Sequence, residues 1–288
     1  MSAAPSDVHG RISRLFIYPV KSCGGVELQE AVLTETGLEF DRAWMVVDEQ
    51  GEFVSQRELP RMALIVPKMR FHDMGLRAPG MLALHIALDA VEQPCKVRVW
   101  DDEVSAYDMG DTAAQWFSDF LGQKLRLARF DPDVRRLSSL QWTRGVEALN
   151  QFSDGYPLLV ASEASLDGLN ARLANAGHAP VGIERFRPNV VLVGVEAHDE
   201  DRLASLRIDT GDAPVELLPV KPCARCPIPN VDPATGQSSP AVGDALQAYR
   251  QDARLNGAVT FGMNVIVTAG LEQVLRVGQP VAGNYAFD

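Results

Sequence analysis

The stretch Lys221-Pro-Cys-Ala-Arg-Cys226, followed by Val231-Asp-Pro-Ala-Thr-Gly236, says more about the protein's chemistry than any other part of the sequence. It places two cysteines and an arginine close together and then closes with a turn. Thiolates bind soft metals and carry out redox reactions. Arg225 favours the thiolate form of a neighbouring cysteine and can also bind an anion. The stretch therefore indicates a thiolate ligand for an anionic metal cofactor.

Three other interpretations of Cys223 and Cys226 stay open at this point. A thioredoxin-like redox pair needs a βαβ context, and no such pattern surrounds the cysteines. A structural zinc site needs two further ligands at close spacing, whereas Cys23 and Cys95 are isolated and no histidine lies near a cysteine. Two inert cysteines near a turn are the third interpretation, although buried cysteines usually have apolar neighbours and this pair flanks an arginine.

Composition narrows the class of protein. The chain has 288 residues, of which 46% are hydrophobic and 23% charged, as in ordinary globular proteins. Its net charge of -11 argues against binding nucleic acid or anionic lipid. Four cysteines do not form a disulfide framework in a chain of this length, and the apolar runs are too short to span a membrane. Residues 1–10 resemble no signal peptide and are expected to be a disordered tail, so we expect a cytoplasmic protein.

The first part of the chain is rich in predicted strands. Arg11–Val20, Arg42–Asp48 and Arg61–Val66 are apolar and β-branched segments bounded by turn residues. A hairpin is expected around Asp101-Asp102. A helix from Asp111 to Leu121 follows, with apolar residues on one face.

The second part begins with a polar segment, Asp131–Asn150, that we interpret as a linker or opening loop. Ser162 is expected to cap a helix. Val190–Val195, Val215–Val220 and Asn264–Thr268 are predicted buried strands. Strands dominate both parts, so the sequence predicts a mainly β (α+β) protein with two β-barrel-like domains and short helices.

Basic residues recur in otherwise apolar or glycine-rich strings. Lys21-Ser22 follows a strand and precedes two glycines, Arg42 opens a strand, and Arg187 stands just before a buried strand. Each of them alone is most simply a charge at the end of a strand. Together, in an acidic protein, they would form a focused anion pocket that suits a phosphate or a pterin.

The sequence resembles MOSC-domain proteins of the type of the mitochondrial amidoxime reducing component and its bacterial relatives. Four motifs in the family's order carry the resemblance: Tyr18-Pro-Val-Lys-Ser-Cys23, Asp41-Arg-Ala-Trp44, Phe186-Arg-Pro-Asn189 and the Cys223 stretch quoted above. The resemblance extends from about Arg11 to Val281. It implies an N-terminal MOSC β-barrel domain over residues 11–130 and a MOSC domain over residues 131–288.

The resemblance also implies a molybdenum cofactor between the two domains. Cys226 matches the family's molybdenum ligand and is the expected catalytic residue. Asn264 and Tyr156, with Asp232, are candidates for a general acid, and Cys223 receives no role. Pyridoxal phosphate binding is kept open beside the molybdenum cofactor. The residues expected to bind the cofactor are Lys21, Ser22, Arg42, Asp154, Gly155, Tyr156, Arg187, Asn189, Arg225 and Asn264.

The implied activity is the reduction of N-hydroxylated or other small N-oxygenated substrates. No cysteines remain for a ferredoxin domain, so a separate reductase or ferredoxin-type protein is the expected electron donor. Pro227 and Pro229 depart from the family pattern and leave the shape of the substrate opening undetermined. Two alternatives are a sulfur carrier with a persulfide on Cys226 and Cys223 as resolving thiol, and a module that binds the cofactor without turnover.

Overall fold

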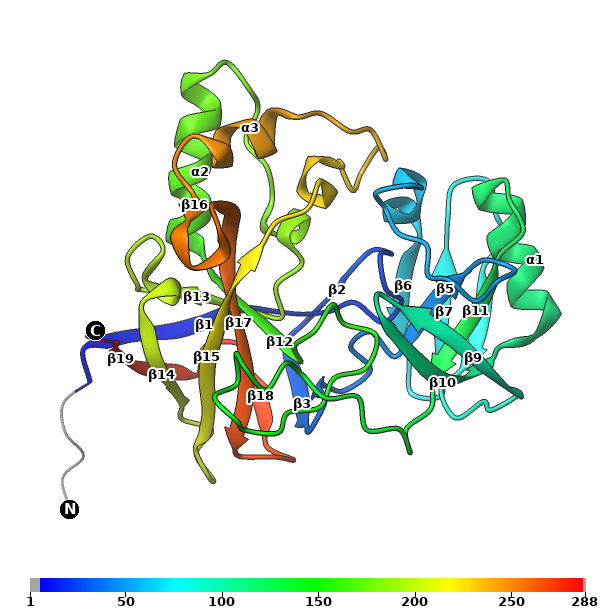
Figure 1. Ribbon diagram of the computed structural model, residues 1–288, viewed down its shortest axis with the longest axis horizontal. Helices are drawn as coiled ribbons and strands as arrows, with labels where there is room; N and C mark the ends of the chain where they lie inside the picture. The colour runs from blue at the N-terminus through cyan, green and yellow to red at the C-terminus, as the bar shows by residue number, and fades with distance from the viewer. Residues whose placement is uncertain (1–5, 287–288) are drawn as a thin grey trace.

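The computed structural model describes residues 6–286, and its strands form two lobes (Figure 1). The barrel lobe, at the left of Figure 1, contains the first strand of the chain and most strands after residue 150. The N-terminal lobe, at the right, contains the strands from β5 (Trp44–Val47) to β11 (Arg126–Phe130) and helix α1 (Gly110–Leu121). The mainly β fold class predicted from the sequence is confirmed.

A closed barrel forms the centre of the larger lobe. Its strands follow one another in the order β12 (Leu158–Ser162), β13 (Val190–Val193), β1 (Val8–Ile17), β19 (Pro280–Tyr285), β14 (Leu203–Ile208), β15 (Val215–Ala224) and β17 (Ala258–Ala269). The pairing of β17 with β12 joins the two ends of this sheet, so the barrel wall has no free edge. Two short strands extend it: β2 (Val26–Leu28) pairs with β1, and β16 (Gln251–Asp252) pairs with β17. A separate three-stranded sheet has the order β18 (Val274–Arg276), β3 (Glu30–Thr34) and β4 (Gly37–Leu38).

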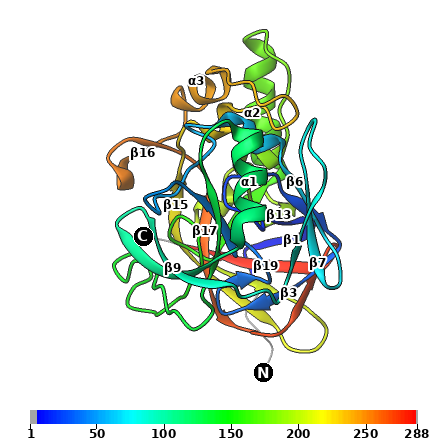
Figure 2. The ribbon, with the colours of Figure 1, turned by 90° about the vertical axis from the view of Figure 1, so that its right-hand side faces the viewer.

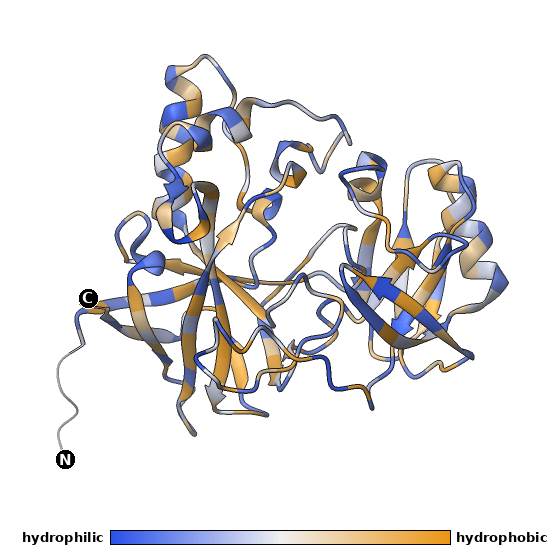
Figure 3. Cartoon of the chain, in the orientation of Figure 1, coloured by the Kyte–Doolittle hydropathy of each residue, from blue (hydrophilic) through white to orange (hydrophobic). Residues whose placement is uncertain are grey.

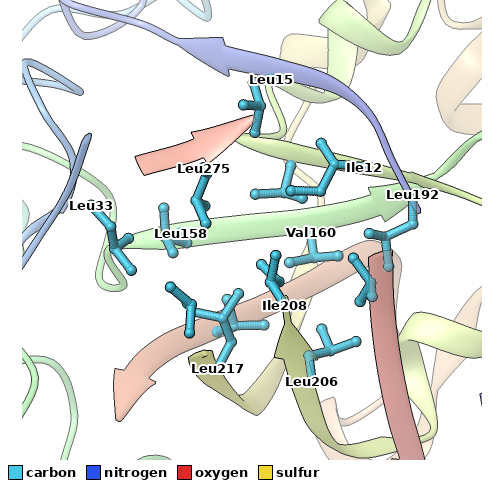
Figure 4. Close-up of a cluster of buried hydrophobic side chains, with 14 of the residues drawn as sticks. Ile12, Leu15, Leu33, Leu158, Val160, Leu192, Leu206, Ile208, Leu217 and Leu275 are labelled. Carbon is cyan, nitrogen blue, oxygen red and sulfur yellow. The ribbon is translucent and has the colours of Figure 1, made fainter. Parts of the chain in front are cut away.

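The barrel interior is filled by alternate side chains of its strands, because successive residues of a strand point to opposite faces. Figure 4 shows Ile12, Leu192 and Leu206, from three different strands, pointing toward one another. Along the barrel strands in Figure 3, apolar and polar residues follow one another. This pattern is the structural result of the β-branched and apolar runs seen in the sequence.

The N-terminal lobe consists of two small sheets and one helix. One sheet has the order β5, β11, β10 (Asp102–Asp108) and β9 (Gln93–Val99), and the other the order β6 (Val66–Met69), β7 (Asp73–Arg77) and β8 (Leu84–Ala87). Helix α1, in front in Figure 2, buries Phe117 and Phe120 in the lobe's core. It ends at Gly122, whose φ of 78° is a conformation that glycine adopts without strain.

Two helices, α2 (Glu163–Asn175) and α3 (Ala241–Gln247), pack together at one end of the barrel lobe (Figure 1). Ser162 begins α2 as predicted, since its hydroxyl accepts a hydrogen bond from the Ser165 N–H at 3.1 Å. Within residues 6–286, no helix has the length and apolar character needed to cross a bilayer. Short 3-10 helices complete the chain: η1 (Pro60–Leu64), η2 (Ile183–Phe186), η3 (Asp199–Asp201), η4 (Ile228–Asn230) and η5 (Ala253–Leu255).

Two local predictions from the sequence were wrong. Arg61–Val66 is not a strand but falls mostly in η1, which Pro60 begins because proline has a helical φ and no N–H for a strand ladder. Of the expected tail 1–10, residues 1–5 lie outside the described residues, whereas Val8–Gly10 begin β1 and pair with β19. β1 thus enters the barrel lobe before the chain builds the N-terminal lobe. The domain boundary near residue 130 stays a prediction.

Candidate functional site

A pocket lies where segments of both lobes meet, and it gathers Cys226 and every residue predicted to bind the cofactor. The segments come from regions far apart in the chain, namely the segment after β1, the residues before and after β5, the loop before β12, the end of η2, and β15 with β17. The predicted residues that line it are Lys21, Ser22, Arg42, Asp154, Gly155, Tyr156, Arg187, Asn189, Arg225, Cys226 and Asn264. Asp232, the third candidate for a general acid, does not line this pocket and pairs with Arg185 at 3.3 Å.

Lys21 connects the two sides of the pocket. Its side chain is buried, and its ammonium donates to the backbone oxygen of Phe152 at 2.8 Å and to the carboxylate of Asp154. Burial lowers the pKa of Lys21, and the charge of Asp154 opposes that shift. Asp154 itself is 69% exposed, so its carboxylate lies at the mouth of the pocket. The pocket therefore has a buried cation inside and an acid at its rim.

Three lining residues adopt a left-handed backbone conformation that side-chain-bearing residues rarely adopt. The φ angles are 66° for Ser22, 51° for Arg42 and 58° for Arg187. A conformation of this kind costs about 1–3 kcal/mol per residue and persists only where the surrounding structure enforces it. Their concentration at one pocket indicates that its backbone is shaped for a function rather than for stability alone.

The pocket is strongly basic although the whole chain is acidic. A single carboxylate, Asp154, lines it, and Arg42 is also paired with Asp41 behind it. Like charges this close raise the local positive potential, which low-dielectric walls focus into the pocket. An anion is the ligand that would offset this charge. The basic side chains that line the pocket are Lys21, Arg42, Arg57, Arg187, Lys221 and Arg225.

Two of these arginines keep donors that no residue of the described chain satisfies. Arg187 donates through Nη1 to the backbone oxygen of Cys23 at 2.6 Å, and its Nη2 is buried without a protein partner. Arg225 donates to Phe186 O at 3.0 Å and to Cys223 Sγ at 2.9 Å, and its Nε is likewise buried and unpartnered. Buried donors are normally paired, so a ligand rich in acceptors fits this set.

The two cysteines of the opening stretch both line the pocket, Cys223 near the end of β15 and Cys226 just beyond it. The sequence suggested that Arg225 acts on Cys226. In the structure its guanidinium instead contacts the sulfur of Cys223 and the backbone oxygen of Phe186. Cys226 is left available as a ligand in the pocket.

Asn189 and Asn264 line the pocket, but their amides bind backbone. Asn189 Oδ1 accepts from the Leu159 N–H at 3.0 Å, and its Nδ2 donates to Phe16 O at 3.2 Å. Asn264 Nδ2 donates to Lys221 O at 3.0 Å. These side chains therefore hold neighbouring strands together at the edge of the pocket, a role that the sequence alone did not reveal.

Several residues that line the pocket were not predicted, and only some of them had a signal in the sequence. Lys221 stands in the opening stretch, immediately before Pro222 and Cys223, so its position was a usable signal. Ser55 and Arg57 belong to no motif in the sequence and reach the pocket only through the fold of the N-terminal lobe. Arg57 also stacks over Trp100 with 4.5 Å between its Cζ and the ring centroid.

Two family models match successive parts of this chain. The MOSC N-terminal beta barrel domain matches residues 9–124, and the MOSC domain matches residues 148–282. Mitochondrial amidoxime-reducing component 1 of Mus musculus is 38% identical over 251 residues, which cover 84% of this chain and 72% of that protein. The Homo sapiens component 1 is 36% identical over 287 residues, covering 94% and 82% of the two chains. Component 2 of Rattus norvegicus is 34% identical over 293 residues, with the same coverage.

Proposed function

We propose, since this chain belongs to the MOSC-domain family, that it is a molybdenum-cofactor oxidoreductase that reduces small N-hydroxylated compounds, as the names of its relatives suggest. The observation that carries the proposal is one pocket that combines Cys226 with six basic side chains from both lobes. A thiolate together with a set of cations is the donor set that a soft metal on an anionic pterin phosphate requires.

The residues present fit this cofactor. The buried, unpartnered donors of Arg187 and Arg225 suit its phosphate and pterin, and Cys226 offers the thiolate. Lys21, Ser22 and Arg42 would hold it from the N-terminal side. When bound, this cofactor supplies two-electron oxygen-atom transfer, and the chain supplies binding, orientation and electrostatics.

Tyr156 also lines the pocket. Burial raises the pKa of its hydroxyl to about 12, so the group stays protonated at neutral pH and can donate a hydrogen bond to a bound substrate. Asp154, exposed at the mouth, adds a negative charge where a substrate enters. A separate reductase or ferredoxin-type protein as electron donor, and a cytoplasmic location, belong to the same proposal. Pyridoxal phosphate binding stays a prediction.

The test is molybdenum analysis of protein purified from a host that makes the cofactor, with Cys226→Ala and the matched Cys223→Ala variant. We expect near-stoichiometric molybdenum in the wild type and in Cys223→Ala, with lost or altered coordination in Cys226→Ala. With a chemical electron donor, the wild type and Cys223→Ala should reduce an N-hydroxylated amidine, and Cys226→Ala should lose this activity. Absence of molybdenum from the wild type would contradict the proposal.

A sulfur carrier is the second candidate, because Cys223 and Cys226 line the same pocket and Arg225 contacts one of them. In that case the protein would carry labile sulfur on Cys226 and no molybdenum, and Cys223→Ala would slow its release. Mass spectrometry of the intact protein before and after a thiol reductant distinguishes the two candidates.

A further inference from the structure

Tyr18 lies behind the pocket with two guanidinium groups over its ring. The Cζ atoms of Arg42 and Arg187 are 4.4 Å and 4.2 Å from the ring centroid. The ring is 1% exposed, and Gly25 leaves room for it, since a Cβ there would lie 2.6 Å from a ring carbon. Both arginines line the pocket, whereas Tyr18 does not. The ring therefore touches the two basic side chains without touching what they face.

The two arginines have little negative charge to share. Arg42 pairs with Asp41 and donates through Nη2 to the backbone oxygen of Arg187 at 3.0 Å. Burial, and then the charge of Arg42, lowers the pKa of Arg187 to about 10. One carboxylate thus serves two neighbouring cations. The π face of an aromatic ring attracts a guanidinium without neutralising it, so it holds the cations and leaves their charge for a ligand.

We propose that Tyr18 is a positioning residue whose ring fixes Arg42 and Arg187 as a paired anion clamp in the pocket. The inference rests on the proposed function for the identity of the anion, the phosphate of the cofactor. The hydroxyl of Tyr18 is buried, and none of residues 6–286 bonds it, so the ring and not the oxygen performs this role. A phenylalanine at position 18 should therefore preserve anion binding, whereas an aliphatic residue should weaken it.

The experiment is calorimetric titration of inorganic pyrophosphate into the full chain, produced in a host that cannot make the cofactor. The variants are Tyr18→Phe, Tyr18→Leu and, as a matched control, Phe117→Leu, which shortens an equally buried aromatic residue in α1. We expect Tyr18→Phe to bind within about twofold of the wild type and Tyr18→Leu to bind at least about tenfold more weakly, as loss of two desolvated cation–π contacts implies. Phe117→Leu should lose stability but keep its affinity.

Several results would overturn the inference. These are no measurable binding by the wild type, wild-type affinity in Tyr18→Leu, or an equal loss in Tyr18→Phe, which would make the hydroxyl the important group. An equal loss of pyrophosphate affinity in Phe117→Leu would show that the weaker binding of Tyr18→Leu comes from general destabilisation. Molybdenum content tests the proposed function separately. If the protein contains no molybdenum but its variants still bind pyrophosphate with the expected ranking, the proposed function is refuted and the role of Tyr18 in the anion clamp stands.

Discussion

The barrel core and the pocket beside it are built on opposite principles. The core collects apolar side chains from every barrel strand, such as Leu206 and Val265, and its members are almost completely buried. The pocket collects cations, left-handed backbone at Ser22, Arg42 and Arg187, and donors that have no partner among residues 6–286. Every contact in the core lowers the free energy of the folded chain, whereas several features of the pocket raise it.

This difference teaches where a ligand is needed. A protein tolerates local strain and uncompensated charge only where other structure enforces them, and such features concentrate at functional sites. The closed barrel provides that enforcement, because β12, β15 and β17 contribute residues to the pocket and the segment after β1 contributes Lys21 and Ser22. We therefore expect core substitutions to change stability and pocket substitutions to change binding.

The largest effect on stability is expected for Leu206→Ala in the barrel core. Leu206 is 3% exposed, so its truncation removes buried apolar contacts and leaves a cavity that costs about 2–5 kcal/mol. Urea denaturation measures this loss. The control is Val193→Ala on the barrel surface, 40% exposed, for which a change within about 0.5 kcal/mol is expected. Similar losses in both variants would contradict the distinction between core and surface.

Lys21→Met tests the buried cation of the pocket. A methionine of similar shape removes the cost of burying the ammonium but leaves the Phe152 oxygen and the Asp154 carboxylate without their donor, so the free energy of unfolding should fall by about 1–3 kcal/mol. Loss of a charged hydrogen-bond donor should weaken cofactor retention by about 1.5–3 kcal/mol, or roughly tenfold to a hundredfold. Pterin release after dilution measures retention. Lys124→Met, at an 80% exposed position, should change neither quantity, and unaltered retention in Lys21→Met would argue against the basic pocket as the binding site.

Asn189→Ala tests a residue that belongs to both regions. Its amide satisfies the backbone of Leu159 and Phe16, and loss of these bonds leaves buried polar groups unpaired at about 1–3 kcal/mol. We expect a lower thermal midpoint, with cofactor content reduced only as far as the protein unfolds. Asn175→Ala, at the exposed end of α2, is the control. A large loss of cofactor at full stability would instead make Asn189 a direct ligand of the cofactor.

The smallest effect concerns Glu200, a buried acid on the barrel side that accepts bonds from Ser162 and Ser165. Burial raises its pKa to about 6. The folded state therefore binds its proton more tightly than the unfolded state, so this contribution is complete below the ordinary pKa of 4.5 and is lost as the pH rises through 6. The loss amounts to about 2 kcal/mol at most.

Glu200→Gln isolates that contribution, because an amide stays neutral at every pH. The difference in unfolding free energy between the variant and the wild type should grow in favour of the variant between pH 4.5 and 7. His198 nearby titrates in the opposite direction, since burial, followed by the charges of Arg250 and Arg172, lowers its pKa to about 4, but it is present in both proteins and cancels. A difference that does not vary with pH would contradict the raised pKa of Glu200.

Much of the fold was readable in the sequence, because it follows from local patterns. A continuous apolar run predicted the strand Val190–Val195, of which the structure has Val190–Val193, and Ser162 predicted the start of α2 by the chemistry of helix capping. The strand prediction for Arg61–Val66 was wrong, because an apolar segment of that length shows no periodicity that distinguishes a strand from a 3-10 helix. Closure of the barrel by β12 and β17 depends on pairing between distant segments and left no local signal.

The sequence by itself determined the chemistry of the site: a thiol pair with an arginine, and basic residues beside glycines and prolines, pointing to an anionic metal cofactor. Only the tertiary structure decided which groups are free to act. It directed Arg225 to Cys223, occupied Asn189 with backbone, brought Arg57 to the pocket, and placed Tyr18 under Arg42 and Arg187. The physical reason is that residue type fixes which interactions a side chain can form, whereas the partners it finds depend on segments that meet only when the barrel closes.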